Sequence, residues 1–300
     1  SLILKNGDIE SEFYFENPNS EYILKSVEIA KLFEDFLDDT YLTYKIYEDN
    51  LYANLVTTNL SKRLQEVINK NKAMIFMSGT LHSKKVIEKI FGISDYKIVE
   101  AETISPGTIE INLTGKEFDC KYENLNSTRE RYLETLSACI EKAEKHLLVH
   151  VNAFSDLPKN NEIEEFSSKN IISGEKLTEL QEEDKTGKMI SEFKKKKINI
   201  LYSTKCSRGV DFPGDLCNSM IFTKYPYPNP KGAFWKVLKK TQSNDNYWEF
   251  YKDKAEREFL QRLYRALRSK DDHVFVLSPD SRVIDSVRNL QLMNNKRIRD

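Results

Sequence analysis

The chain has 300 residues, of which 39% are hydrophobic and 31% are charged, a composition typical of folded globular proteins and not of disordered ones. Its 46 basic and 47 acidic side chains leave a net charge of −1, so any contact with nucleic acid must come from local clusters of charge. No apolar run approaches the ~20 residues of a membrane span. The four cysteines lack the C-x-x-C spacing of zinc and iron–sulfur sites. We therefore expect a cytoplasmic protein with free thiols and no metal ligands in this chain.

The first hundred residues predict short elements of mixed type. In chain order, the patterns predict a helix over 21–37, a β-hairpin over 41–56 with its turn at 48–50, a helix over 61–68, a strand over 73–77 and a helix over 84–91. The strand over 73–77 leads into Ser78, Gly79 and Thr80. Small residues at that place are also what an ordinary turn between a strand and a helix would contain.

Beyond residue 107, apolar runs alternate with helical patterns. The predicted elements are a helix over 128–144, strands over 145–151 and 171–173, a helix over 182–197, strands over 198–203 and 219–222, a helix over 253–268 and a strand over 273–277. This alternation predicts an α/β fold with a doubly wound, mostly parallel sheet. In such sheets ligands bind at the carboxyl ends of the strands, so we expect a site after the strand over 198–203.

The segment from Ser203 to Phe212 follows that strand and contains Arg208, Gly209 and Asp211. A glycine lets the backbone approach a ligand closely, and an acid can hold a hydroxyl group or a cation. For Asp211 taken alone, capping of the loop is a second interpretation.

A second polar group lies on the predicted helix over 253–268. Gln261, Arg265 and Arg268 are spaced i, i+4 and i+7, so they would project from one helical face. Two guanidinium groups on one stripe suit a polyphosphate, although a solvated basic face is the plainer interpretation. Arg262 lies about 100° around the helix and is expected to tolerate alanine.

These two segments resemble motifs V and VI of the superfamily 2 helicases, in the XPD/DinG branch. Ser78, Gly79 and Thr80 resemble motif III, and Phe154 follows the strand over 145–151 as the aromatic residue of motif IV does. The sequence departs from the usual pattern at Ala153, where serine is common, at Arg208, where many members have glutamate, and at Tyr264, where glycine is usual. An acid pair at 271–272 and the pair Asp280 and Arg282 follow with spacing typical of the branch. By this resemblance, residues 1–98 are the trailing segment of the first motor domain, and residues 99–300 are a RecA-like second motor domain.

The resemblance implies an ATP-dependent DNA helicase that translocates 5′ to 3′ along single-stranded DNA. ATP and Mg²⁺ would bind between two motor domains of the same polypeptide, with Arg265, Arg268 and Gln261 near the γ-phosphate and with Gly209 and Asp211 linking nucleotide to DNA. Ser203, Phe154 and Arg208 would contact the nucleic acid. The chain contains neither the phosphate loop G-x-x-x-x-G-K-[ST] nor a magnesium-binding acid box, both of which the family carries in the first motor domain. We therefore expect this chain alone to be inactive, and any iron–sulfur cluster to belong to the first domain.

A non-enzymatic function is the alternative. The chain would then be a single-stranded nucleic-acid-binding or regulatory module on a RecA-like scaffold. Aromatic side chains would stack on bases, and the candidates are Phe154, Tyr225, Tyr227 and Trp235.

Overall fold

The computed structural model describes residues 28–31, 33–47, 50–99, 107–121, 128–163, 170–204, 206 and 209–297. The chain divides into two compact units. Unit 1 comprises Ser1–Ser78, His82–Lys97 and Pro228–Asp253, and unit 2 comprises Gly79–Leu81, Ile98–Tyr227 and Lys254–Asp300. No helix in the described part of the chain is long and apolar enough to cross a membrane.

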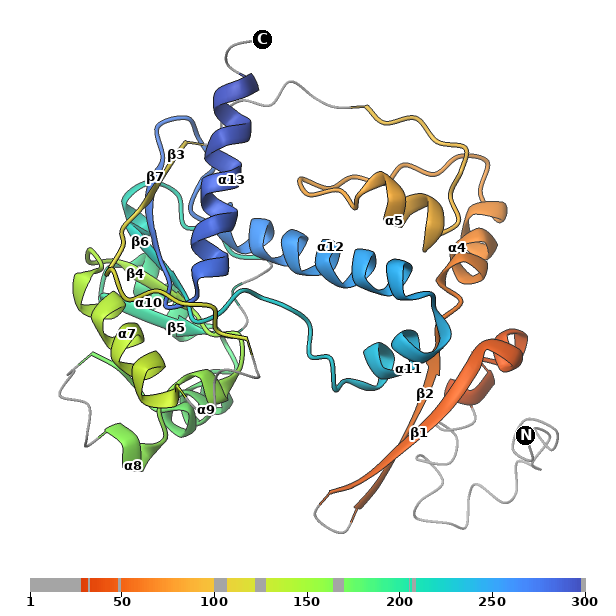
Figure 1. Ribbon diagram of the computed structural model, residues 1–300, viewed down its shortest axis with the longest axis horizontal. Coiled ribbons are helices and arrows are strands. Elements are labelled where there is room, and N and C mark those ends of the chain that lie inside the picture. The colour runs from red at the N-terminus through yellow and green to blue at the C-terminus, as the bar shows by residue number, and fades with distance from the viewer. Residues whose placement is uncertain are drawn as a thin grey trace. The chain divides into compact units, whose positions relative to one another are not determined.

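Unit 2 is built on a five-stranded sheet with the strand order β3-β7-β6-β4-β5 (Figure 1). The strands are β3 (Thr108–Ile111), β4 (Leu147–His150), β5 (Ile200–Ser203), β6 (Ser219–Phe222) and β7 (His273–Leu277). Every neighbouring pair is parallel. The predicted α/β class with a parallel sheet is therefore confirmed. The strands that follow β4 in the chain, β5 and β6, lie on opposite sides of it, so the direction of winding changes at β4.

Helices cover both faces of this sheet. The helices are α7 (Arg129–Lys142), α9 (Gly174–Glu183), α10 (Lys188–Lys194), α12 (Asn244–Leu263) and α13 (Ser281–Arg297), with a short α8 (Asn160–Ile163). Side chains of α10, the second half of α12 and α13 form one buried cluster with Leu148, whereas α7 and α9 form another with Val149. Because successive strand residues point to opposite faces, β4 contributes to both clusters. The result is a sheet buried on both sides, as parallel sheets require.

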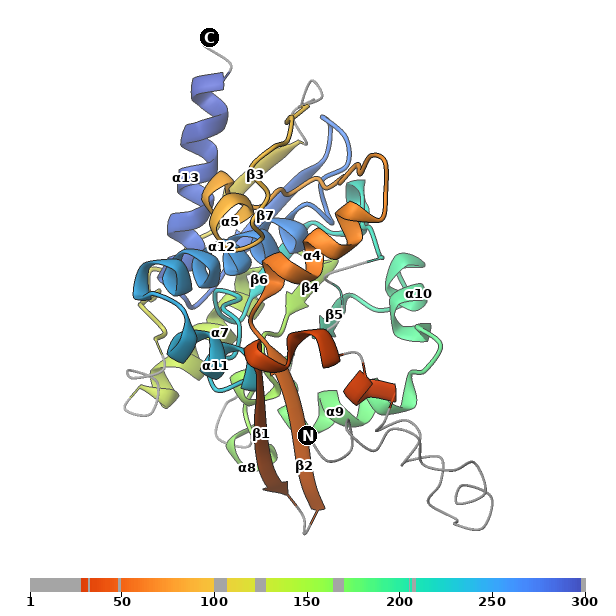
Figure 2. The same cartoon turned by 90° about the vertical axis from the view of Figure 1, so that its right-hand side faces the viewer.

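Unit 1 contains a two-stranded antiparallel hairpin, β1 (Thr40–Tyr47) and β2 (Asn50–Thr57), whose strands lie side by side in Figure 2. It also contains η1 (Glu34–Asp39), α4 (Leu60–Asn69), α5 (Lys84–Lys89), α11 (Ala233–Thr241) and the first half of α12. The register pairs Leu42 with Leu55, Tyr44 with Ala53 and Ile46 with Leu51, so these six residues share one face. Tyr44 and Ile46 are 76% and 74% exposed, which makes this an open apolar face.

Two predicted strands are not strands. Residues 73–77 are exposed and belong to no strand, and the two strands described in unit 1, β1 and β2, pair with each other. Residues 171–173 instead lead into α9, where the Ser173 hydroxyl caps the helix by accepting from the N–H of Lys176 at 2.9 Å. Both segments are rich in residues that favour β-structure, but a strand also needs a neighbouring strand with which to form hydrogen bonds.

Helix boundaries also differ from those predicted. The helix over 182–197 is interrupted between α9 and α10, where Gly187 adopts a left-handed φ of 75° and Asp184 caps the new start. The helix over 253–268 runs instead from Asn244 to Leu263. The predicted helix over 21–37 is described as helix only at 28–31 and as the 3₁₀ turn η1, and positions 48–49 of the predicted hairpin turn lie outside the described residues. The sequence patterns missed β3, α8, α11, α13 and all but the last two residues of α9.

Candidate functional site

Arg265 and Arg268 do not lie on a helix, because α12 ends at Leu263 and the chain turns there. This corrects the predicted helical face. The two side chains nevertheless meet on one carboxylate oxygen. Asp211 Oδ1 accepts from Arg265 Nη1 at 2.8 Å and also from Arg268 Nη2. The backbone reinforces the contact, since the N–H of Phe212 donates to the carbonyl of Arg265 at 2.7 Å.

The three charged groups are unequally exposed. The side chain of Arg265 is 16% exposed, whereas those of Arg268 and Asp211 are 44% and 45% exposed. Partial burial raises the pKa of Asp211, but hydrogen bonds from Arg268 and Arg265 outweigh it and hold the pKa below its ordinary value. Asp211 is therefore ionised and carries one negative charge against two positive ones. The more exposed side of the cluster is at Arg268.

Gln261 has a different partner from the two arginines. From the last turn of α12, its Nε2 donates to the hydroxyl of Thr80 at 3.0 Å. One turn earlier, Arg257 Nε donates to the carbonyl of Thr80 at 2.9 Å. Both the hydroxyl and the backbone carbonyl of Thr80 therefore accept a hydrogen bond from α12. The segments predicted as motif III and motif VI contact each other through these two bonds. Gly79 belongs to unit 2 with Thr80, whereas Ser78 belongs to unit 1.

The other residues predicted for the segment after β5 are spread along it. Ser203 ends β5 and is buried, and its hydroxyl accepts from the N–H of Cys206 at 3.1 Å. Gly209 has a left-handed φ of 74°, a conformation that glycine adopts without cost. Arg208 lies outside the described residues.

The arginine cluster is tied to the amino end of the sheet. Gly214, three residues after Asp211, donates its N–H to Asp272, which immediately precedes β7. The segment after β5 therefore returns from the carboxyl end of that strand to the start of β6. We expected a single site at the carboxyl ends of the strands, and the structure instead separates Ser203 from the charged cluster along this returning segment.

Of the four aromatic candidates for base stacking, Phe154 is the most exposed. It begins η2 (Phe154–Asp156) after β4, and its residue is 39% exposed. Tyr225 is buried and stacks on Phe259. The guanidinium group of Arg282 lies 5.3 Å from the centre of the Tyr227 ring. Trp235 packs in unit 1 among four aromatic rings, those of Phe234, Tyr247, Phe250 and Tyr251.

The sequence contains Gly-Lys at 115–116 and at 187–188, and neither pair belongs to a phosphate loop. At the start of α10, the carboxylate of Asp184 accepts from the N–H groups of Lys188 and Met189. Near residue 115, Glu117 accepts from the N–H groups of Thr114 and Gly115. The backbone donors that would bind phosphate are already occupied by carboxylates.

The residues of this chain fit the phosphates of a nucleotide but not its metal ion. Arg265 and Arg268 are fork-shaped donors suited to phosphate oxygens. Magnesium needs carboxylate oxygens, and the described residues contain no group of three acidic, histidine or cysteine side chains that could hold a metal.

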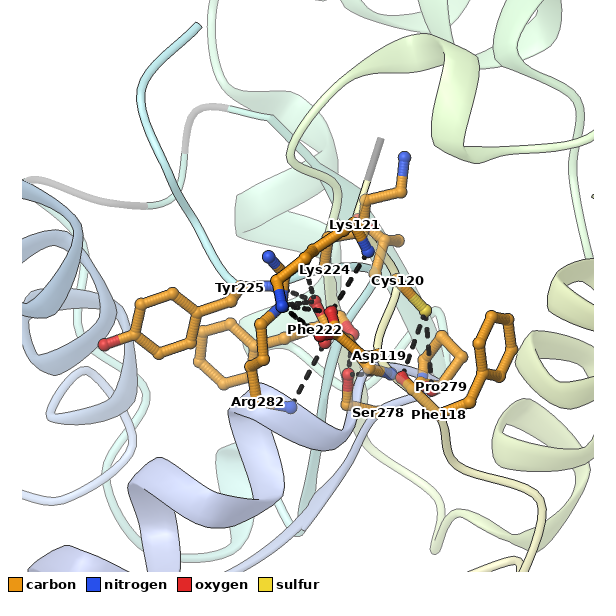
Figure 3. A network of polar contacts seen from close by, with 12 residues as sticks. Phe118, Asp119, Cys120, Lys121, Phe222, Lys224, Tyr225, Ser278, Pro279 and Arg282 are labelled. Carbon is orange, nitrogen blue, oxygen red and sulfur yellow. Dashed lines mark hydrogen bonds and ion pairs between the residues drawn. The ribbon is translucent and has the colours of Figure 1, made fainter. Parts of the chain in front are cut away.

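A second charged network, which the sequence did not reveal, closes the carboxyl end of β7 (Figure 3). Asp280 is fully buried and accepts from the N–H of Tyr225 at 2.9 Å and from Arg282 Nη2 at 2.7 Å. Lys224 pairs with Asp156, another buried carboxylate. Asp119 joins the same network, since it lies 3.5 Å from Arg282 and pairs with Lys121 at 2.7 Å. The positive groups are therefore matched by carboxylates, and the network joins loops. The Asp-x-Arg spacing at 280–282 was visible in the sequence, but its burial was not.

Comparison with known proteins places the chain among helicases. Residues 136–297 match the helicase C-terminal domain family. The chain is 23% identical over 235 residues to the 3′-5′ exonuclease DinG of Staphylococcus saprophyticus, and 24% identical over 238 residues to that of Staphylococcus aureus. Each match covers 74% of this chain and 25% of the relative.

Solved structures show the same fold. The chain superposes on an XPD helicase structure with a TM-score of 0.59 at 19% identity, and on an apo XPD structure with a TM-score of 0.61 at 18% identity. The S. tokodaii protein Xpd4 gives a TM-score of 0.52 at 18% identity. These matches cover 92% of this chain but 52%, 59% and 57% of the respective structures. The chain thus spans about half of the solved relatives and a quarter of the curated ones.

Proposed function

Because the chain belongs to the helicase C-terminal domain family, as the C-terminal part of an XPD/DinG-type helicase, we propose that it serves as the second motor domain of an ATP-dependent DNA helicase. The complete polypeptide would move 5′ to 3′ along single-stranded DNA. Its first motor domain would be this chain's principal partner. The four cysteines are free and buried, which suits a reducing compartment and supports a cytoplasmic location.

The observation that supports this proposal is the sharing of Asp211 by Arg265 and Arg268. Two guanidinium groups share one carboxylate oxygen, and the group of Arg268 is well exposed. A terminal phosphate carries more negative charge than a carboxylate and presents three oxygens, so it competes well with Asp211 for these donors.

ATP with Mg²⁺, bound on the first motor domain, would supply the phosphoryl group whose hydrolysis drives movement. Arg265 and Arg268 would hold its terminal phosphate and stabilise the charge on the equatorial oxygens during transfer. Asp211 keeps both guanidinium groups in place while no phosphate is present. Gln261 holds Thr80 and so orients the segment that precedes α5, which would couple the nucleotide state to the first motor domain.

Single-stranded DNA would contact the chain at the end of β4 and along the segment after β5. Phe154 offers the exposed ring there, and Ser203, Gly209 and Arg208 lie on that segment. A purely stacking module is less well supported, because Tyr225 and Trp235 are engaged within aromatic clusters.

The test is single-stranded-DNA-stimulated ATP hydrolysis by the complete polypeptide. We expect Arg268→Ala to lower kcat by about 10³-fold or more with little change in KM, because a phosphate-directed arginine acts mainly on the transition state. Arg288→Ala is the matched control, since Arg288 is an exposed arginine of α13 that pairs with Asp285. The isolated 300-residue chain should hydrolyse ATP at the background rate. Turnover by the isolated chain, or full activity of Arg268→Ala, would contradict the proposal.

A further inference from the structure

Asp272 is a buried carboxylate that accepts hydrogen bonds from three backbone N–H groups. It lies immediately before β7 and is 5% exposed. Its Oδ2 accepts from the N–H of Arg268 at 2.5 Å and from the N–H of Ser269 at 2.7 Å. Its Oδ1 accepts from the N–H of Gly214 at 2.8 Å. One side chain therefore joins the turn that carries Arg268 to the segment that carries Asp211.

The backbone of Asp272 is fixed as firmly as its side chain. Its carbonyl accepts from the N–H of Thr108 at 2.9 Å, at the start of β3. A Cβ atom added to Gly107 would lie 2.3 Å from that carbonyl oxygen, so the chain there has room for glycine and for no larger residue. Asp272 is thus anchored to the edge strand of the sheet and cannot shift to follow a moving loop.

Burial raises the pKa of Asp272, but the N–H groups of Arg268, Ser269 and Gly214 outweigh it and lower the pKa below its ordinary value. The carboxylate is ionised and accepts three hydrogen bonds with its two oxygens. An asparagine of the same size has one accepting oxygen, so it cannot satisfy the donors on both sides.

We propose that Asp272 is a positioning residue for Arg268. It holds the backbone of the arginine, whereas Asp211 holds the side chain. This inference rests on the proposed function, because it assigns Asp272 a role in ATP hydrolysis through Arg268. A group that acts on a transition state must be held close to its productive place, and a displacement of about 1 Å costs on the order of 10²-fold in rate.

The experiment is a double-mutant cycle in the complete polypeptide, with kcat and KM for ATP measured in the presence of single-stranded DNA. We expect Asp272→Asn to lower kcat about 10- to 100-fold with KM within about two-fold. Asp271→Asn, a change of the same kind at the adjacent exposed residue, should stay within about two-fold of the wild type. In the Arg268→Ala background, Asp272→Asn should lower kcat by less than two-fold further, because a positioning residue has nothing left to position.

A merely structural role predicts a different result, namely that the losses of Asp272→Asn and Arg268→Ala multiply. That outcome, or full kcat in Asp272→Asn while Arg268→Ala is inactive, would overturn the positioning role and leave the proposed function intact. Activity that survives Arg268→Ala would overturn both. If Asp272→Asn does not fold, Asp272→Glu keeps the charge but moves it by one methylene, and the same cycle then decides.

Hydrogen exchange on the 300-residue chain gives a readout that does not need ATP hydrolysis. In Asp272→Asn, the amide protons of Arg268, Ser269 or Gly214 should exchange at least tenfold faster, while those in the centre of β7 stay protected. Unchanged exchange at all three amides would show that the carboxylate of Asp272 does not hold these N–H groups.

Discussion

Two of the carboxylates that bind arginine in unit 2, Asp211 and Asp280, differ in almost every other respect. Asp211 is 45% exposed and is shared by two guanidinium groups, whereas Asp280 is fully buried and has Arg282 and the backbone N–H of Tyr225 among its partners. An exposed carboxylate that is shared by two guanidinium groups can be exchanged for a ligand. The carboxylate of a buried, balanced pair cannot be exchanged without leaving a charge in a low-dielectric interior. We therefore expect the cluster at Asp211 to exchange partners and the pair at Asp280 to stabilise the fold.

The largest effect should come from removing each carboxylate in turn. Asp280→Ala leaves Arg282 without its principal partner, and we expect it to lower the free energy of unfolding by about 3–5 kcal/mol. Asp211→Ala should lower it by about 1 kcal/mol or less, because exposed ion pairs contribute little. Urea denaturation of the 300-residue chain measures both. Equal losses would show that the exposed Asp211 and the buried Asp280 contribute equally to stability.

The two arginines that bind Asp211 should differ in how much each contributes to stability. The side chain of Arg265 is largely buried, so Arg265→Ala should cost about 1–2 kcal/mol of stability through lost packing. Arg268→Ala should cost about 0.5 kcal/mol or less. Both changes should lower kcat for ATP hydrolysis by the complete polypeptide by about 10³-fold or more. Equal stability losses in urea would show that Arg268 stabilises the fold as much as Arg265 does.

Arg262 is not the neutral control that its helical position predicted. It is buried and pairs with Glu258 at 2.9 Å. Alanine at this position should therefore lower stability, and the exposed Arg288 is the appropriate reference.

A third effect depends on pH. Burial, together with the nearby Arg262 and Arg265, holds the pKa of His150 well below its ordinary value of 6.5. Below pH 6.5 the unfolded chain binds a proton at this position and the folded chain does not, so stability falls as the pH falls. The contribution should be about 1 kcal/mol between pH 6.5 and pH 5.5, and it approaches about 1.4 kcal/mol per pH unit at lower pH. It should disappear in His150→Phe, which keeps a ring against Phe222. Urea titrations at pH 6.5 and 5.5 test this, and an unchanged difference in the variant would exclude His150 as the cause.

The smallest effect is a difference in salt dependence. A double-mutant cycle on stability should give Asp211 and Arg268 a coupling of about 0.2–1 kcal/mol at low salt, falling toward zero at 1 M, where the screening length is about 3 Å. The coupling between Asp280 and Arg282 should persist, because water and ions do not reach a buried carboxylate. Equal screening of both pairs would show that Asp280 is accessible to solvent.

The sequence predicted the parts of unit 2 that depend on local pattern. The apolar runs at β4, β5, β6 and β7 identify a buried sheet because each is short, rich in branched side chains and bounded by a helix or a turn. The spacing of Arg265 and Arg268 identified both residues of the charged cluster. The prediction placed both arginines on one face of a helix, and the structure corrects this because α12 ends at Leu263, before either arginine.

The remainder depends on contacts between distant residues. No glycine or proline marks the end of α12, so the sequence could not show that Arg265 leaves the helix. Asp272 accepts from a residue 58 positions earlier in the chain, which spacing cannot reveal. Residues 73–77 have the composition of a strand, but composition cannot say whether a neighbouring strand is present.

The open face of the β1–β2 hairpin affects how the 300-residue polypeptide behaves during expression and purification. Leu42, Tyr44, Ile46 and Leu51 present a water-exposed stripe, and the sheet has two strands in the part of the chain that the structure describes. Such surfaces recruit other copies of a chain and are the kind that molecular chaperones recognise. Placing lysine at positions 44 and 46 should reduce concentration-dependent light scattering without touching unit 2. A surface variant of this kind would be the practical starting material for the measurements on Asp211, Asp272 and Asp280.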